Sequence, residues 1–163
     1  MIRTGAALIV LMLAGACEKQ SDTATDPSPS PSPSTFAFTD SERALCVSQT
    51  NELRASVGRP PLARSSSLEE FATRAAEADH NSRQAHSYYS ANAAGVWSAE
   101  NEVLFWPITL YGTVQGVVRA AISGYWSEGP GGGHYNNIVG AYMQLGCGAH
   151  IEGTSITFVQ EFR

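Results

Sequence analysis

Glu128 and His134 are the residues whose types and spacing first suggest chemistry. His134 follows Glu128 by six residues, and three consecutive glycines, Gly131 to Gly133, lie between them. Such a flexible segment can fold back and bring the imidazole close to the carboxylate. A carboxylate and an imidazole that meet in one cleft can bind a divalent metal ion or share a proton. The pair alone does not establish a site, because histidines are common in loops and a nearby glutamate can be a coincidence.

The segment before Glu128 predicts the helix that positions it. Thr113 is a suitable N-cap, and Gly129 with Pro130 ends the helix. The apolar residues between them share one helical face: Val114, Val117, Val118, Ala121, Ile122, Tyr125 and Trp126. Glu128 therefore lies at a helix end, and the glycine segment leads into an apolar strand pattern from Met143 to Ile151.

The letters around this pair resemble the C-terminal signatures of the CAP superfamily, the SCP-like domains. Residues 125–128 read Tyr-Trp-Ser-Glu, residues 133–139 read Gly-His-Tyr-Asn-Asn-Ile-Val, and residues 145–148 read Leu-Gly-Cys-Gly. Family members read roughly W-x-x-E, then G-H-Y-T-Q-V-V-W, then V-G-C-G. The family joins cysteine-rich secretory proteins, insect venom allergens and plant pathogenesis-related proteins.

Further motifs extend the resemblance from Ser41 to Phe162. Residues 51–62 look like the opening signature N-x-x-R-x-x-x-G-x-x-P-L, and Val159 to Phe162 resembles the last strand of bacterial members. His86-Ser87 resembles a His-Ser or His-Thr pair that follows the second helix, and residues 98–101 resemble the family's Gly-Glu-Asn. An exposed loop histidine is the ordinary alternative for His86.

The resemblance implies that four side chains converge in one cleft: His86, Glu100, Glu128 and His134. Such a set can bind zinc or another divalent cation, with His86 and His134 as the possible metal ligands, or can hold a water between acid and base. Glu100 and Glu128 are the candidate catalytic carboxylates. Glu102 is also nearby, but Glu100 is preferred because Asn101 follows it as the motif requires.

The sequence also departs from the family pattern at particular positions. Arg64 replaces a tryptophan, Ala99 a glycine, Asn136-Asn137 a Thr-Gln pair, and Gly140 the last tryptophan of the G-H-Y motif. The glutamate follows Trp126 by two residues instead of three, although Tyr125 could take that tryptophan's place. None of these changes removes one of the four proposed cleft residues.

Two earlier helices and a terminal hairpin complete the expected folded part. Capping boxes at residues 39–42 and 67–70 predict helices that start near Asp40 and after Ser67. The first helix should bury a stripe of Cys46, Thr50, Leu53 and Val57, and the second Leu68, Phe71, Ala72, Ala75 and Ala78. His80 should lie at the surface, and the aromatic residues Trp97, Phe105 and Trp106 in the core or at a cleft rim. A β-hairpin is predicted by the apolar runs from Met143 to Ile151 and from Thr154 to Phe162, which are joined at Gly153. Its second strand should be covered on both faces. His150 should be a strand or turn residue of this hairpin.

This order of elements indicates an α+β fold. The resemblance implies the CAP-type α-β-α sandwich with a central antiparallel sheet, formed by residues 36–163.

The N-terminal residues predict export and a lipid anchor. Residues 1–16 contain Arg3 and an apolar run too short to span a bilayer, which is typical of a cleaved signal. Residues 13–17 resemble a bacterial lipobox, in which Cys17 is lipidated; cleavage after Ala16 with a free Cys17 is the alternative. Residues 17–35 contain a Pro-Ser repeat and predict an extended tether.

The cysteines suggest a disulfide, and the net charge and the glycine segment argue against two classes of binding site. With Cys17 assigned to the anchor, Cys46 and Cys147 form an even pair in an exported protein, which suggests one disulfide; two buried thiols are the alternative. The net charge is −5 and no basic patch is visible, so we expect no nucleic-acid partner. No Gly-Lys-Ser/Thr follows the three glycines, so the phosphate-loop motif is absent.

Three functions remain open at this point. The favoured one is a membrane-anchored, monomeric binding module for a lipid, a peptide or an envelope component. The second is a metal-dependent hydrolase in which Glu100 or Glu128 acts as general base. The third is a scaffold whose histidines merely hydrogen-bond to the glutamates.

Overall fold

The computed structural model describes residues 36–93 and 99–163. The helices and strands follow in the order α1 (Asp40–Ser56), β1 (Ala63–Arg64), α2 (Ser66–Ser82), α3 (Ser87–Asn92), β2 (Ala99–Pro107), α4 (Ile108–Tyr111), α5 (Val114–Ser127), α6 (Gly133–Val139), β3 (Gln144–Glu152) and β4 (Ser155–Phe162). The expectations for the signal, the tether, Cys17 and Trp97 lie outside the described residues. Within the described ranges, no helix is long and apolar enough to cross a membrane.

The four strands form one sheet in the order β1-β3-β4-β2. The hairpin β3–β4 and the pair β2–β4 are antiparallel, as expected, whereas the two-residue β1 joins β3 in parallel. Glu100 lies directly opposite Glu161, and Asn101 opposite Gln160. This register places alternate residues of β2 on opposite faces of the sheet, which decides which of its polar side chains can meet.

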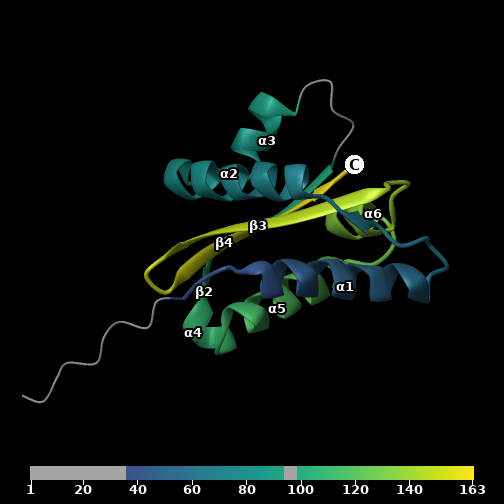
Figure 1. The fold of residues 1–163 in the computed structure, drawn as a ribbon, viewed down its shortest axis with the longest axis horizontal. Coiled ribbons are helices and arrows are strands. Elements are labelled where there is room, and N and C mark those ends of the chain that lie inside the picture. Colours follow the sequence, from purple (N-terminus) through teal and green to yellow (C-terminus); the bar gives the residue numbers. More distant parts are fainter. Residues whose placement is uncertain (1–35, 94–98) are drawn as a thin grey trace, which may run out of the picture. The chain divides into compact units, whose positions relative to one another are not determined.

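Helices cover both faces of the sheet, which confirms the α-β-α layering. Figure 1 shows α2 and α3 on one side of the sheet and α1, α4 and α5 on the other. The main core lies between the sheet and α1 and α5, and it includes Val117, Ile122, Phe158 and Phe162. A smaller cluster of Ala72, Ala75, Ala76 and Val159 lies under α2. β4 is buried along almost its whole length, as the sequence predicted.

Helix α1 starts as predicted but buries a different face at its C-terminal end. The backbone N–H of Thr39 donates to the Glu42 carboxylate at 2.8 Å, which completes the capping box. Val57 is 44% exposed, whereas Arg54 is fully buried, so the stripe continues to Arg54 and the prediction for Val57 is wrong. The Arg54 guanidinium donates to three backbone carbonyls, those of residues 60, 138 and 140. A buried arginine is stabilised by this use of its planar set of donors.

Helix α2 starts earlier than its sequence signature predicts. Ser65 is the N-cap, and the N–H of Glu69 already donates to the Ser65 carbonyl at 3.0 Å, so the prediction that Ser67 caps this helix is wrong. The reason is tertiary: the N–H of Ser65 donates to the Leu145 carbonyl, which fixes the point where the chain leaves β1. The predicted buried face is otherwise confirmed at Leu68, Ala72 and Ala75.

Glycines on β3 let α2 lie very close to the sheet. A Cβ atom on Gly146 would lie 2.3 Å from the Leu68 carbonyl carbon, and one on Gly148 would lie 2.3 Å from the Thr73 nitrogen. The alanines on α2 complete this contact from the helix side. Backbone packs against backbone here, which is the close approach for which glycine is needed.

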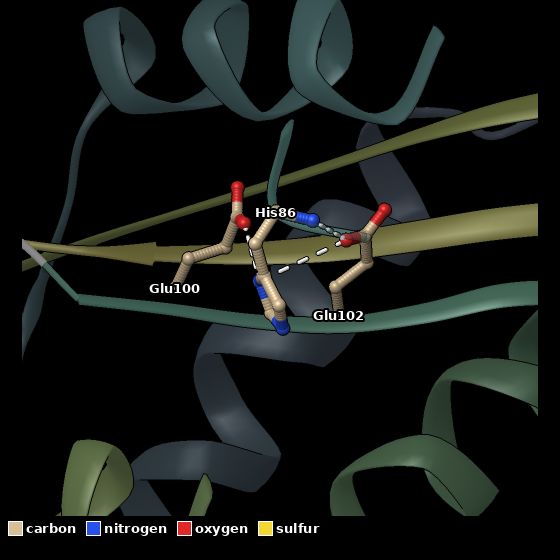
Figure 2. A group of neighbouring side chains, drawn as sticks. All are labelled: His86, Glu100 and Glu102. Carbon is tan, nitrogen blue, oxygen red and sulfur yellow. Dashed lines mark hydrogen bonds and ion pairs between the residues drawn. The ribbon is translucent and has the colours of Figure 1, made fainter. Parts of the chain in front are cut away.

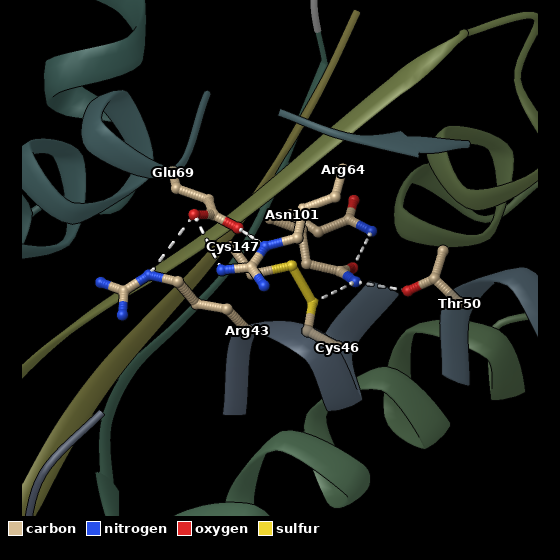
Figure 3. Close-up of a disulfide and its surroundings, with 8 residues drawn as sticks. Arg43, Cys46, Thr50, Arg64, Glu69, Asn101 and Cys147 are labelled. Carbon is tan, nitrogen blue, oxygen red and sulfur yellow. Dashed lines mark hydrogen bonds and ion pairs between the residues drawn. A yellow bond between two sulfur atoms is a disulfide. The ribbon is translucent and has the colours of Figure 1, made fainter. Parts of the chain in front are cut away.

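The predicted disulfide is present and joins α1 to β3. Cys46 and Cys147 are bonded, with 6.5 Å between their Cα atoms, and both are fully buried. The amide of Gln160 donates to the Cys46 sulfur at 3.4 Å and to the Thr50 hydroxyl at 2.9 Å. Figure 3 also shows Arg64, at the position where the family pattern has a tryptophan, beside Glu69; it donates to that carboxylate and to Asp40.

His80 is buried between α2 and the sheet, so the prediction of a surface position is wrong. Its Nδ1 lies 2.9 Å from the Thr157 hydroxyl, and its Nε2 lies 3.2 Å from the Glu152 carboxylate. The rings of Phe105 and His150 contact it at centroid distances of 4.5 and 4.7 Å. Both ring nitrogens therefore have partners within the fold, which makes burial acceptable. His150 lies in β3, as expected.

Candidate functional site

Strand β2 places two carboxylates on one face of the sheet, beside His86. Glu100 and Glu102 are two residues apart, so their side chains point to the same side, and they are 1% and 0% exposed. His86 precedes α3 and has a left-handed backbone conformation, with φ of 60°. Figure 2 shows its imidazole and its backbone N–H directed toward the two glutamates.

Three contacts tie His86 to these carboxylates. Its Nδ1 lies 2.7 Å from Glu100 Oε1 and 3.8 Å from Glu102 Oε2, and its backbone N–H donates to Glu102 Oε2 at 2.7 Å. The hydrogen bond with Glu100 raises the pKa of His86 above its usual value, against the opposing effect of burial.

The site gathers more buried carboxyl groups than His86 alone can pair with. The pKa of Glu102 is raised to about 7, mainly by burial and also by the nearby Asp79 and Glu100, against the lowering effect of the hydrogen bond from the His86 N–H. Burial and the contact with Glu100 raise the pKa of Glu161 to about 11. One oxygen each of Glu100 and Glu102, and both of Glu161, are buried with no hydrogen-bond partner in the described structure. Unpartnered buried acceptors are unusual, and a cation, a proton or a bound water would satisfy them.

Asp79 holds the loop that presents His86. It accepts hydrogen bonds from the Ser87 hydroxyl and from the backbone N–H of Tyr88, which follow the histidine directly. Asp79 is fully buried at the end of α2. The position of His86 is thus fixed from α2 as well as from β2.

Glu128 and His134 form a second pair, at the junction of α5 and α6. Glu128 is the C-cap residue of α5, and His134 lies in the first turn of α6. The His134 Nδ1 lies 2.5 Å from Glu128 Oε1, and its backbone N–H donates to Oε2 at 2.9 Å. The hydrogen bond with His134 lowers the pKa of Glu128. A Cβ atom on Gly132 would lie 2.4 Å from the Glu128 Cβ, so a glycine is required for this close turn.

Two asparagine side chains connect the pairs. The amide of Asn137 donates to the Glu100 carbonyl at 3.0 Å and to Asn101 Oδ1 at 2.9 Å. The amide of Asn101 lies 3.3 Å from the His134 carbonyl. This explains why Asn101 follows Glu100: it points to the opposite face of β2 and binds α6 there.

An open cleft of about 370 Å³ lies beside the first pair. Its lining residues are His86, Tyr89, Ser90, Ala99, Glu100 and Asn137. Most of these side chains can hydrogen-bond. Glu128 and His134 do not line it, and Phe105 and Trp106 are also absent from it; Trp106 packs against the core and stacks on Tyr111 at 5.2 Å.

The predicted four-residue set is thus present as two hydrogen-bonded pairs. Within the ranges that the structure describes, the compact group able to hold a metal ion is His86, Glu100 and Glu102, whose ligand atoms all lie within 4.8 Å of one another. Glu102, which the motif argument set aside, replaces Glu128 and His134 in that group. Strand alternation was the signal that could have found it, because Glu-Asn-Glu in a strand puts both carboxylates on one face.

Comparison with known proteins shows which family this chain matches. A family model described as CAP, the cysteine-rich secretory protein family, matches residues 47–162. No curated protein sequence matches the chain.

Several solved structures have a similar fold. The chain is similar to Na-ASP-1, with a TM-score of 0.58 and 17% identity; the match covers 80% of this chain but 40% of Na-ASP-1, so this chain spans less than half of that protein. It is similar to an outer surface protein from Borrelia burgdorferi, with a TM-score of 0.59 and 14% identity over 78% of this chain and 96% of that one. It is also similar to NaASP2, in a crystal structure with Zn²⁺, with a TM-score of 0.58 and 14% identity. That match covers 77% of this chain and 80% of NaASP2.

Proposed function

Because the chain belongs to the cysteine-rich secretory protein family, we propose that it is an exported binding module whose cleft holds a polar ligand beside a divalent cation. The observation that carries this proposal is the group of His86, Glu100 and Glu102 at the cleft. Two of its members also line the cleft itself.

The residues fit a cation of the zinc class. An imidazole and two carboxylates are ligands that zinc accepts, and three protein ligands leave a position for a further molecule. Glu100 Oε2 and Glu102 Oε1 are buried without hydrogen-bond partners, which a positive ion would correct. The similar fold of NaASP2 has been crystallised with Zn²⁺. A cation there supplies positive charge for a carbonyl, carboxylate or phosphate oxygen of the ligand.

The lining of the cleft favours a polar ligand. Ser90, Glu100 and Asn137 place polar side chains in the wall, and the cleft is open to solvent. An acyl chain would gain little from so open a cleft, because burial of apolar surface is what binds it. We therefore favour a peptide or an envelope fragment over a lipid.

Zinc titration by calorimetry, with the full chain, tests the site. We expect micromolar or tighter binding to the parent, complete loss in His86→Ala, and at least tenfold weaker binding in Glu102→Gln. Absence of zinc binding to the parent would contradict the metal part of the proposal and leave a scaffold whose histidines only hydrogen-bond to glutamates.

The His134→Ala variant distinguishes two possible zinc sites: the group of His86, Glu100 and Glu102, and the four-residue set that includes Glu128 and His134. If His86, Glu100 and Glu102 hold the ion, His134→Ala should change zinc affinity less than threefold, because His134 is bonded to Glu128 in a separate pair. Equal loss in His86→Ala and His134→Ala would instead mean that the four residues act together.

A metal-dependent hydrolase is the second candidate, and one observation favours it. The pKa of Glu102, raised to about 7, suits a general base at neutral pH. Its side chain is fully buried, however, which argues against direct contact with a substrate water. Turnover of a chromogenic ester by the zinc-loaded protein, lost in Glu102→Gln, would support catalysis.

Co-sedimentation distinguishes the ligand classes. The zinc-loaded protein is mixed either with insoluble peptidoglycan or with phosphatidylglycerol vesicles, in a Cys17→Ser background that removes any acyl anchor. Binding to peptidoglycan that His86→Ala abolishes would support the proposal. Equal binding of His86→Ala and the parent would show that the cleft is not used.

Export and anchoring are part of the same proposal. The buried disulfide supports an oxidising compartment, and the Borrelia burgdorferi protein with a similar fold is an outer surface protein. The lipobox-like residues before Cys17 favour a bacterial lipoprotein type, anchored to a membrane and facing the periplasm or the exterior. Labelled palmitate should enter the protein in cells and should be absent from the Cys17→Ser variant.

A further inference from the structure

A second, smaller cavity lies at the start of α2, apart from the cation cleft. Its volume is about 140 Å³, and its wall includes Ser67, Leu68, Phe71, Arg74, Glu161 and Arg163. Ala93, just after α3, closes one side. None of these residues lines the cation cleft. We call this cavity the α2 pocket.

The inner part of the α2 pocket is apolar and held in place. Leu68 is buried, and Phe71 packs edge to face on Tyr88 with 5.2 Å between ring centroids. A dry, apolar cavity of about 150 Å³ binds benzene. A volume of about 140 Å³ is therefore enough to hold a single six-membered ring.

Two arginines give the wall positive charge. Arg74 donates from Nε to the Tyr88 hydroxyl at 3.3 Å, and its Nη1 lies 4.0 Å from Glu70, which is outside the pocket. Arg163 donates from Nε and Nη2 to Gln144 Oε1. A guanidinium carries five N–H donors, so both arginines keep donors for an anion.

The position of Arg163 is set by the sheet. Its N–H donates to the Gln144 carbonyl at 3.0 Å, and its carbonyl accepts from Met143 and Gln144 at 2.7 Å each. Among the described lining residues, Glu161 is the one with a carboxylate side chain, and both of its side-chain oxygens are buried. Even if ionised, it would offset only one of the two guanidinium charges.

We propose that the α2 pocket binds a small organic carboxylate whose apolar part is the size of one ring. The ring occupies the space against Leu68 and Phe71, and the carboxylate pairs with Arg74 and Arg163. Paired hydrogen bonds from arginine are the strongest recognition of a carboxylate that a protein surface offers. The three proposed cation ligands, His86, Glu100 and Glu102, do not line this pocket.

Benzoate is the probe, and calorimetry measures its binding to the full chain in the presence of EDTA. The NMR chemical shifts of the Phe71 and Ala93 amides follow the same titration. We expect a dissociation constant tighter than about 1 mM. Benzamide, which has the same size but no charge, should bind at least fivefold more weakly. Arg74→Gln and Arg163→Gln should each weaken benzoate at least fivefold. Arg119→Gln, an exposed arginine of α5 on the other face of the sheet, should change nothing.

A substitution that fills the α2 pocket provides the second test of benzoate binding. Ser67→Leu puts a larger side chain on a rigid helix at the pocket wall, and it should abolish benzoate binding while His86→Ala leaves it intact. No saturable benzoate binding up to about 10 mM would overturn the proposal, as would equal affinity for benzamide. Parent-like binding by Ser67→Leu would place the benzoate elsewhere and overturn it too.

Discussion

At the scale of residues, the molecule is defined by a set of carboxyl groups buried between α2 and the sheet. Glu100, Glu102, Glu161 and Asp79 are each less than a tenth exposed, and His86 is the basic side chain that reaches two of them. Burying carboxylates without full partners costs several kcal/mol per charge. A fold that keeps such a cluster has a use for it, and cation binding is the use that we propose.

Glu102→Gln should stabilise the metal-free protein at alkaline pH. The pKa of Glu102 is raised from 4.5 to about 7, so its favourable contribution is complete below pH 4.5 and is lost as pH rises through 7. Glutamine has no charge to bury and can still accept the His86 N–H. We expect the free energy of unfolding in EDTA to rise by about 2 kcal/mol at pH 8.5 and to be nearly unchanged at pH 4.5.

Urea denaturation at both pH values measures this difference. Glu77→Gln, which removes an exposed carboxylate from the same α2 helix, is the matched control and should have little effect at either pH. An equal shift at pH 4.5 and 8.5 in Glu102→Gln would mean that its ionisation is not the cause.

At the scale of elements, the close approach of α2 to β3 holds the site in place. Gly146 and Gly148 admit the α2 backbone, and α2 in turn presents Asp79, which holds the loop of His86. The other side of β2 binds α6 through Asn101 and Asn137. The cleft is therefore positioned by packing on both faces of one edge strand.

Gly148→Ala should be strongly destabilising. The new methyl group would meet the backbone nitrogen of Thr73 at 2.3 Å, and backbone atoms of a packed helix cannot move aside cheaply. We expect a loss of about 3 kcal/mol in the free energy of unfolding. Gly124→Ala, at an exposed position in α5 with open space around it, should gain about 0.5–1 kcal/mol. Similar effects of the two substitutions would show that α2 is not packed this closely.

Sequence patterns predicted two helix starts at which local chemistry decides the structure. The Thr39–Glu42 capping box and the Thr113 N-cap were read correctly, because each satisfies its helix from within a few residues. The Ser67 capping box failed because the hydrogen bond from the Ser65 N–H to the Leu145 carbonyl, just after β1, lets the helix start earlier. Arg54 and His80 were missed as buried residues, since their partners are distant in sequence and no local pattern reveals them. Glu102 was set aside for a different reason: the family motif favoured Glu100, although alternation along β2 places both carboxylates on one face.

At the scale of the whole molecule, one disulfide connects the α1 layer to the sheet. Cys46 and Cys147 are 101 residues apart, so the bond closes most of the folded chain into one loop. Cross-linking a loop of that size restricts the unfolded state strongly. The pairing was predictable from cysteine number and export, whereas its position between α1 and β3 was not.

Removing this bond should lower stability without removing the site. We expect the Cys46→Ala/Cys147→Ala protein to lose about 4–5 kcal/mol of unfolding free energy, measured by urea denaturation. Its zinc affinity at 25 °C should stay close to that of the parent wherever it is folded, because none of the three proposed ligands contacts the sulfurs. Cys17→Ser serves as the control and should leave stability unchanged. A loss below about 1 kcal/mol would show that the cross-link hardly constrains the unfolded chain.

The central claim is that a divalent cation is held by His86 with Glu100 and Glu102. The chain contains four histidines, at positions 80, 86, 134 and 150, so nitrogen NMR of the imidazole rings can follow each one during zinc addition. We expect the ring signals of His86 to shift in proportion to bound zinc while those of His80, His134 and His150 stay in place. Unchanged His86 signals at saturating zinc, or a shift of His134 as large as that of His86, would contradict the claim.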